Sequence, residues 1–311
     1  MQICYEKETI VIVLHLYKIG DRTKIITKVQ FTRWTDSANY SFFHGPKLIK
    51  NDKLVSYNFN FCNIGCMIRI LRKLHWLYSI LVIFVFSLLF YPIYYLFSRN
   101  ERYYYLLNLS RQLHSSICSF FIGVFYKFNY EVSLNKAQNY IFCANHSSNL
   151  DIMILCILGR GKFHFLGKEE LLNNPVLKLF FKTIDVPVNR DSKMSSFRAF
   201  KKVGENLDKG MSLIIFPEGK IDETHYPPVL QSFKNGPFRL AIDKKIPIVA
   251  VSLQDVWKKM WDDGSKYGTR PGLCHIYIHK PIPTSELNIE ESDMLKDRIF
   301  ALINTKISEW S

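Results

Sequence analysis

The sequence of 311 residues is poor in glycine and proline, with 14 and 12 of them respectively. This scarcity excludes a collagen-like chain and a Pro/Gly-rich low-complexity chain, because both are built largely from these residues. A disordered chain is excluded as well, because 48% of the residues are hydrophobic. Only one uncharged stretch is long enough to cross a bilayer, so a polytopic membrane protein is not expected.

The cysteine pattern gives no support for a disulfide framework. The number of cysteines is odd, and several of them lie within apolar runs. Cys62 and Cys66 have the spacing of half a metal site, but no second Cys/His pair follows at a suitable distance. We therefore expect buried free thiols and no metal site. The seven positions are Cys4, Cys62, Cys66, Cys118, Cys143, Cys156 and Cys274.

Positive charge is in excess, with 41 Lys and Arg residues against 27 Asp and Glu residues, a net charge of +14. Such an excess is typical of proteins that bind nucleic acid or an anionic membrane surface. No run of five or more basic residues occurs, and the charge alone does not decide between the two partners. The long apolar segment favours the membrane, and since no nucleic-acid-binding module is recognisable, we expect no nucleic acid partner.

The chain divides into three predicted parts at 1–66, 67–128 and 129–311. The first part contains strand-like runs at 10–16 and 24–31 but no motif, so its role is unknown. Met67 opens a basic and then apolar stretch that suits the start of a membrane protein. We therefore expect 67–311 to be a complete enzyme and the extension to be dispensable.

Residues 76–97 carry no charge and would form a helix of about 33 Å, enough to cross the hydrocarbon core of a bilayer. Aromatic residues lie at both ends of this stretch, as is usual at membrane interfaces. A second uncharged run, 112–126, is too short to span comfortably. The basic flanks are nearly symmetric and suit a helical hairpin that enters one leaflet and returns. A single span and a soluble pair of core helices are the alternatives.

Residues 129–311 alternate strand-like and helix-like segments. This pattern predicts an α/β domain with a mostly parallel central sheet flanked by helices. A final helix is expected at 293–307 with Ser292 as its N-cap. The predicted strands are 140–144, 163–166, 184–188, 212–216, 246–253 and 274–279, and the earlier helices are 150–158, 175–182, 195–208 and 236–244.

Four polar segments carry the candidate chemistry, and three of them follow predicted strands, where open α/β sheets bind ligands. In the first, Asp151 can fold back onto His146, fixing its tautomer and making its second nitrogen a better base. In the second, Glu218 lies between Pro217 and Gly219-Lys220, a combination that can hold a hydroxyl and an anion. The other two place Arg190 after a strand, as a phosphate ligand, and Lys168 before a helix.

The order and spacing of these segments resemble the lysophosphatidic acid acyltransferase family, the 1-acyl-sn-glycerol-3-phosphate O-acyltransferases, and in particular its bacterial members. The resemblance covers about 128–283, with the apolar 67–128 matching more loosely. The matching segments are Asn145-His146 with Asp151, Lys168 with Glu170-Leu171, Arg190, Phe216-Pro217-Glu218-Gly219, the stretch 233–241, and Ile246-Pro247-Ile248-Val249-Ala250-Val251.

The resemblance implies the glycerolipid acyltransferase fold and the transfer of a fatty acyl group to the sn-2 hydroxyl of lysophosphatidate, giving phosphatidate in phospholipid biosynthesis. The donor would be a thioester of coenzyme A or acyl carrier protein, with no bound cofactor. His146 is then the general base and Asp151 orients it. No acyl-enzyme is required, and Ser147 lacks the Gly-x-Ser-x-Gly elbow of a nucleophile. The implied substrate-binding residues are Glu218, Gly219, Arg190, Lys168 and Lys220.

One departure concerns the third segment, where many family members continue with Thr-Arg-Ser but this chain has Lys220-Ile221-Asp222. Lys220 then replaces an arginine's charge without its bidentate geometry. An acyltransferase acting on another lysolipid is therefore one alternative. A non-catalytic membrane-bound lipid-binding protein is the other, although such a protein would have no use for the base formed by His146 and Asp151. For the family function, the expected location is the inner (cytoplasmic) membrane, on its anionic leaflet, with the active site facing the cytoplasm.

Overall fold

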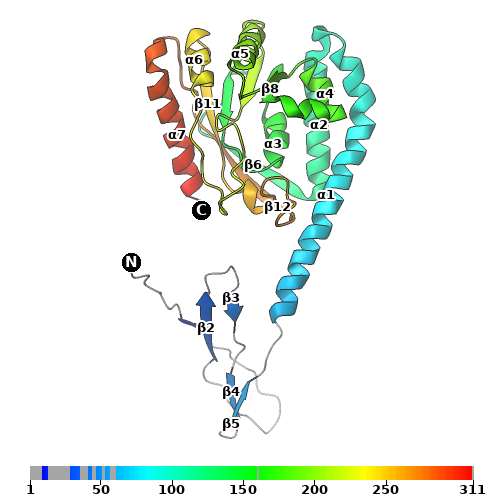
Figure 1. Cartoon of the computed structure of the whole chain (residues 1–311), viewed down its shortest axis with the longest axis vertical. Helices are drawn as coiled ribbons and strands as arrows, with labels where there is room; N and C mark the ends of the chain where they lie inside the picture. Colours follow the sequence, from blue (N-terminus) through cyan, green and yellow to red (C-terminus); the bar gives the residue numbers. More distant parts are fainter. Residues whose placement is uncertain are drawn as a thin grey trace. The chain divides into compact units, whose positions relative to one another are not determined.

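The computed structural model describes residues 9–12, 29–35, 41–43, 47–50, 53–56, 61–159 and 161–309 (Figure 1). The chain divides into two compact units, Met1–Ile70 and Leu71–Ser311, which we describe separately.

The described strands of the first unit form two small antiparallel sheets. One has the order β1-β2-β3, and the other pairs β4 with β5. The predicted runs at 10–16 and 24–31 overlap β1 and β2, and the remainder of each run lies outside the described residues. These strands are β1 Thr9–Ile12, β2 Val29–Thr35, β3 Ser41–Phe43, β4 Lys47–Lys50 and β5 Lys53–Ser56.

Helix α1, Phe61–Ser98, has 38 residues and is longer than the predicted 76–97, because arginine and lysine are good helix formers and continue the helix upstream. Its segment Cys66–Ser98 has a mean hydropathy of 2.3 and is long and apolar enough to cross a membrane. Most of its large apolar side chains are exposed, with Phe84 and Leu88 each at 65%. A core helix of a soluble protein would bury them.

Helix α2, Tyr104–Ile122, packs antiparallel to α1 after the turn η1, Glu101–Tyr103. The contacts run in opposite order along the two helices: the Tyr78 hydroxyl donates to Phe121 O, the Phe90 ring lies 5.2 Å from that of His114, and Phe97 lies near Tyr103 of the turn η1. The structure therefore has the predicted hairpin of helices, which lie side by side in Figure 1.

The second uncharged run, 112–126, is only partly helical, which corrects the prediction. Helix α2 ends at Gly123, whose φ of 75° is left-handed and favours glycine. The chain then continues as strand β6, Val124–Tyr130, which pairs along its whole length with β12. Residues 124–128, expected in the membrane-associated helices, thus belong to the sheet.

The main sheet has the strand order β6-β12-β11-β7-β10-β8-β9 within the described residues. Every neighbouring pair is parallel except β11 with β12. The predicted α/β class and mostly parallel sheet are confirmed. Apart from β6, the strands are β7 Ile141–Ala144, β8 Phe163–Lys168, β9 Val186–Val188, β10 Ser212–Ile215, β11 Ile248–Leu253 and β12 Gly272–Ile278.

Helices cover both faces of this sheet. Alternate residues of β7 point to opposite sides, with Phe142 in one core beside α1, α2 and α3, and Ile141 in another beside α5, α6 and α7. The remaining helices are α3 Leu150–Leu158, α4 Pro175–Phe181, α5 Lys193–Asp208, α6 Gly236–Asp243 and α7 Ser292–Ser308, with 3-10 turns η2 Glu169–Asn173, η3 Val256–Lys258 and η4 Ile289–Glu291.

The prediction of Ser292 as an N-cap is wrong. Ser292 is the first residue of α7, and the capping function lies one turn earlier in η4. There the Asn288 side chain accepts from a backbone N–H while the Glu291 side chain accepts from the backbone N–H of Asn288.

Candidate active site

Parallel strands bring three predicted segments to one edge of the sheet. Strand β7 ends just before Asn145, β10 just before Phe216, and β9 two residues before Arg190. Since these strands run in the same direction, their carboxyl ends lie at the same edge, which is where α/β sheets bind ligands.

His146 and Asp151 meet within the turn that connects β7 to α3, here called the His146 loop (residues 145–151). His146 Nδ1 lies 3.0 Å from Asp151 Oδ2. Because a carboxylate only accepts, Nδ1 carries the proton and Nε2 has the free lone pair. The same Oδ2 accepts the backbone N–H groups of Ser147 at 2.7 Å and Ser148 at 2.9 Å. The carboxylate thus fixes both the ring and the loop.

Asn145 fixes the start of the His146 loop. Its side-chain amide donates to Leu253 O at 3.1 Å, and its carbonyl oxygen accepts from Leu253 N at 2.7 Å. The pair joins the ends of β7 and β11, so the His146 loop begins from a rigid point. The ring of His146 in turn stacks on Phe216, with ring centroids 3.9 Å apart and planes inclined by 13°.

Glu218 is buried and braces the His146 loop. Its Oε1 accepts from His146 N and its Oε2 from Gln231 N, each at 2.7 Å. Burial raises the pKa of Glu218 to about 8, against the opposing effect of these two N–H donors. The sequence predicts Glu218 as a ligand of the acceptor, whereas the contacts in the structure are internal. Glu218 therefore has a structural role in holding the His146 loop, and its role as a ligand of the acceptor stays a prediction.

Arg190 lies over Gly219. A Cβ placed on Gly219 would be 3.6 Å from Arg190 Nη1, and the φ of 82° at this position also favours glycine. The guanidinium therefore lies beside the Glu218 turn and at the same edge of the sheet as His146. Its exposed position leaves it accessible to an anion.

Lys168 and Lys220 are both exposed. Among the described residues, no hydrogen bond or ion pair joins either of them to His146, Asp151 or Glu218. The structure thus assembles His146, Asp151, Glu218, Gly219 and Arg190, while roles for the two lysines stay predictions.

Two further acidic residues shape the site and have no signal in the sequence. Asp262 contacts the His146 loop from more than 100 positions away, and burial raises its pKa, with help from Asp263 and Glu223. Asp222 organises the turn after Gly219. Burial acts to raise the pKa of Asp222, but hydrogen bonds from Thr224 and from the backbone N–H of Val229 outweigh it and hold that pKa well below its usual value.

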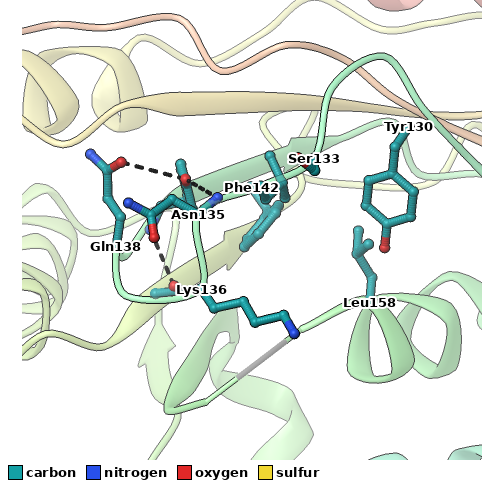
Figure 2. Close-up of a pocket in the computed structure, with 10 residues that line it drawn as sticks. Tyr130, Ser133, Asn135, Lys136, Gln138, Phe142 and Leu158 are labelled. Atoms are coloured by element: carbon teal, nitrogen blue, oxygen red, sulfur yellow. Dashed lines mark hydrogen bonds between the residues drawn. The ribbon is translucent and has the colours of Figure 1, made fainter.

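A cavity of about 270 Å³ lies at the other end of the sheet, away from this site (Figure 2). It is lined by Tyr130, Phe142, Leu158 and the 133–138 turn, where the Tyr140 hydroxyl accepts from Asn135 N at 3.1 Å. It adjoins the start of β7, whereas ligands of parallel sheets bind at strand ends. No predicted site residue lines it.

Residues 127–254 match the family model described as Acyltransferase. This segment, which is less than half of the chain, is similar to that family, and we call residues 127–254 the acyltransferase domain after this match. The match ends one residue after Leu253, so it contains all of the predicted site residues together with strands β7 to β11.

The acyltransferase domain is also similar to curated proteins. The chain is 30% identical over 187 residues to the chloroplastic 1-acyl-sn-glycerol-3-phosphate acyltransferase LPAT1 of Arabidopsis thaliana, covering 58% of this chain and 51% of that protein. It is 26% identical over 169 residues to the 1-acyl-sn-glycerol-3-phosphate acyltransferase alpha of Homo sapiens, covering 52% and 56%. The chain therefore spans about half the length of these relatives. The resemblance seen in the sequence is confirmed.

Among solved structures, the crystal structure of the 1-acyl-sn-glycerophosphate (LPA) acyltransferase PlsC from Thermotoga maritima is similar to this chain. The TM-score is 0.63 at 21% sequence identity, with 78% of this chain and 97% of that chain covered. At this identity the match establishes the fold of the acyltransferase domain, in agreement with the predicted class.

Proposed function

We propose that the chain transfers a fatty acyl group from a thioester to the sn-2 hydroxyl of lysophosphatidate, giving phosphatidate. The observation that carries the proposal is His146, oriented through Nδ1 by Asp151, with Arg190 at the same edge of the sheet. The relatives named as 1-acyl-sn-glycerol-3-phosphate acyltransferases support the choice of acceptor.

The reaction needs a base, because a glycerol hydroxyl is a poor nucleophile at neutral pH. Nε2 of His146 takes the hydroxyl proton while the oxygen attacks the thioester carbonyl carbon, forming the new C–O bond. The C–S bond then breaks, and the leaving thiolate receives the proton from the imidazolium. Asp151 stabilises the imidazolium between these steps, as carboxylates do in His-based acyl transfer.

Arg190 is assigned to the phosphate of the acceptor, because a guanidinium donates two parallel hydrogen bonds to phosphate oxygens. Gly219 leaves the surface beside the guanidinium open. Lys220 adds positive charge next to this position, and Lys168 is assigned to the thioester carbonyl. Glu218 is assigned to the acceptor hydroxyl as well, and it acts there by holding the His146 loop, whose backbone N–H it accepts, in position beside that hydroxyl.

The α1–α2 hairpin is assigned to the cytoplasmic leaflet of the inner membrane, with both ends on the cytosolic side. Its exposed apolar side chains match lipid, and this placement keeps the acyl chains in the bilayer while the head group reaches His146. Cysteine labelling at 69–73 in sealed vesicles tests it, since labelling from the outer face alone would establish a single span instead.

The domain boundaries proposed from the sequence give a second test. A chain starting at Met67 should be active, because the acyltransferase domain, α2 and nearly all of the apolar segment Cys66–Ser98 of α1 lie beyond this position. A folded and membrane-bound 67–311 protein without activity, beside an active full chain, would assign a function to the first 66 residues.

The decisive assay incubates the purified chain with labelled acyl-coenzyme A or acyl-acyl carrier protein and a panel of lysolipids. Labelled phosphatidate should form from lysophosphatidate and should be absent with His146→Ala. Acylation of a different lysolipid alone would identify another acceptor. Binding of lysolipids without turnover of any would identify a non-catalytic lipid-binding protein.

A further inference from the structure

The segment between η3 and β12, residues 259–270, connects the membrane helix α1 to the His146 loop, and we call it the bridging loop. Nothing in the proposed mechanism uses it. It contacts the His146 loop at one end through backbone hydrogen bonds, and it contacts α1 at the other end through backbone and side-chain groups.

At the catalytic end, the bridging loop pairs with the His146 loop as a short parallel strand would. Ser148 and Asp262 form an isolated β-bridge. Asp262 N donates to Ser147 O and Asp262 O accepts from Asn149 N, both at 2.9 Å. These bonds fix the residues between His146 and Asp151, so the approach of the two side chains depends on the position of Asp262.

At the membrane end, the bridging loop is bonded to one side of α1. Thr269 N donates to Arg72 O at 3.1 Å, and the Thr269 hydroxyl lies 2.6 Å from His75 Nδ1. The Trp76 indole Nε1 donates to Asp263 O at 2.8 Å. The ammonium of Lys73 donates to Ser265 O. These four contacts place the bridging loop against residues 72–76 of α1, about one and a half helical turns.

Two glycines allow this close approach. Gly268 has a φ of 72°, and a Cβ there would lie 2.6 Å from the backbone carbonyl atoms of Arg72. Gly264 has a φ of 79°, and a Cβ there would lie 2.7 Å from the Trp76 ring. A distance under 3.0 Å to backbone cannot be relieved by a side-chain rotation, so Gly268 in particular requires glycine.

The bridging loop is internally bonded and therefore moves as a unit. Met260 and Thr269 form an antiparallel bridge, and Arg270 N donates to Lys259 O at 3.0 Å. Gly264 N donates to Trp261 O at 2.9 Å. A displacement at Thr269 is consequently passed across the loop to Asp262, next to the His146 loop.

We propose that Trp76 and Thr269 are positioning residues for acyl transfer: through the bridging loop, α1 holds the His146 loop in the conformation in which His146 meets Asp151. The inference rests on the proposed function. It makes the apolar helix part of the catalytic apparatus as well as a membrane anchor, so that turnover requires α1 to be docked against the bridging loop.

A pair of glycine substitutions isolates the contact with α1. Gly210 has a φ of 77°, close to that of Gly268, but a Cβ there meets nothing within 4 Å. Gly210→Ala and Gly268→Ala therefore add the same backbone strain, and only Gly268→Ala pushes the loop from α1. We expect Gly268→Ala to lower kcat by about 10- to 100-fold with unchanged KM for both substrates, and Gly210→Ala to leave kcat near wild type.

Milder variants guard against misfolding. Trp76→Phe keeps an aromatic ring but loses the bond to Asp263 O, and Thr269→Val keeps the shape but loses the hydroxyl. Both should lower kcat without a matching fall in Tm, and Thr269→Ser, which keeps the hydroxyl, should restore it. A merely structural role would lower Tm and leave the kcat of the folded protein unchanged.

Hydrogen exchange of the peptide covering 145–151, measured on the full chain in detergent micelles, provides a readout that needs no substrate. Faster exchange in Gly268→Ala than in Gly210→Ala supports the inference. Wild-type exchange and wild-type kcat in Gly268→Ala, Trp76→Phe and Thr269→Val would overturn it. A wild-type chain that acylates no lysolipid would instead overturn the proposed function. The exchange measurement would still decide whether the contact between α1 and the bridging loop fixes the His146 loop.

Discussion

Two buried Asp-centred pairs hold neighbouring elements of the chain together, Arg111 of α2 with Asp185 and His146 with Asp151, and they differ in whether a nitrogen is left without a partner. Arg111 of α2 donates to both oxygens of Asp185, at 3.2 and 2.9 Å, and the two side chains are 7% and 3% exposed. His146 donates one bond to Asp151, and these side chains are 15% and 0% exposed. One pair contains a guanidinium, and the other contains an imidazole.

The surroundings of the two pairs also differ, because Arg111 is enclosed by aromatic rings and His146 is covered on one face only. The Arg111 guanidinium lies over three rings, those of Phe163, Phe165 and Phe180, at 5.3, 5.1 and 4.6 Å from their centroids. Asp185 also accepts from Phe165 N at 2.9 Å, so this pair fastens α2 to the sheet. His146 has one ring face on Phe216, and its Nε2 has no hydrogen bond among the described residues.

Burial and pairing are common to both pairs, so these two properties alone do not mark a catalytic group. A fully surrounded ion pair contributes to the structure, because both carboxylate oxygens of Asp185 and both terminal nitrogens of Arg111 are bonded. A pair with one nitrogen left over, at a strand end and partly exposed, can exchange a proton with a substrate. Substitutions in the two pairs should therefore separate activity from stability.

The largest effect is expected for His146→Ala. Loss of the general base should lower turnover by about 10²–10⁴-fold, roughly 3–5 kcal/mol of barrier. Asp151→Asn should also lose much activity, because an amide does not stabilise the imidazolium, and the double variant should be little worse than His146→Ala. Turnover at saturating donor is the measurement, and acyl-donor binding should survive in all three.

The control for this prediction is His225→Ala. His225 also pairs with an aspartate, at 2.9 Å from Asp222, but its side chain is 62% exposed, and Asp222 keeps its hydrogen bonds from Thr224 and Val229 without it. Its turnover should stay near wild type. Near-normal turnover in His146→Ala itself would remove the base assignment and leave a different enzyme or a lipid-binding protein.

Arg111→Met is expected to lower stability and to leave turnover nearly unchanged, which is the opposite of the result expected for His146→Ala. Removal of one partner of a buried ion pair leaves Asp185 without its cation and should cost about 3–5 kcal/mol in the free energy of unfolding. The kcat of the folded fraction should change little. Lys209→Met is the matched control: its pair with Glu101 has side-chain exposures of 48% and 61%, so its loss should cost less than about 1 kcal/mol. Denaturant unfolding in detergent compares the two, and equal costs would contradict the assignment.

Arg190→Ala tests the accessible arginine against the enclosed Arg111. It should weaken use of the phosphorylated acceptor by roughly 1.5–3 kcal/mol, the range for a hydrogen bond to a charged group. Most of this loss should appear in the KM for the acceptor, with stability unchanged. An unchanged KM would make Arg190 a structural surface residue.

Glu218 sharpens the comparison because it is a buried carboxylate with backbone N–H donors and no cation. Its pKa is raised from 4.5 to about 8, so between these pH values the folded state binds more protons than the unfolded state. The contribution of Glu218 to the free energy of unfolding is complete below pH 4.5 and is lost as the pH rises towards 8, with a slope of up to about 1.4 kcal/mol per pH unit. The Tm of the wild type should therefore fall over this pH range, and Glu218→Gln should make that fall smaller.

The control for Glu218 is the same substitution at Glu205, whose side chain is 49% exposed and pairs at the surface with Lys202. Glu205→Gln should keep the wild-type dependence of Tm on pH. A Glu218→Gln protein that loses stability with pH just as the wild type does would mean that Glu218 is ionised throughout the range.

Local patterns predicted most of the fold. Helix α3 has the expected bounds, 150–158, because an apolar run follows a polar turn there. Strand β6 was missed because 112–126 is uncharged throughout, and Gly123 is the sign within it of a change from helix to strand. The N-cap of α7 was misplaced because η4 absorbs the capping residues.

The candidate site could be predicted only as far as its motifs reach. His146 and Asp151 are five positions apart, so one turn brings them together. The partners of Glu218 and the contacts of Asp262 join residues far apart in the sequence, and their geometry depends on the packing of the whole sheet. A single sequence has no local signal for such contacts.

The docking of the bridging loop on α1 bears on how this protein can be engineered. An anchor that only holds an enzyme at the bilayer is interchangeable with any apolar helix of suitable length. Here Arg72 presents a carbonyl to Thr269, and Trp76 presents its N–H to Asp263. Replacement of α1 by a foreign transmembrane helix should therefore return a protein that reaches the membrane and does not turn over, and a graft that preserves 72–79 should return one that does.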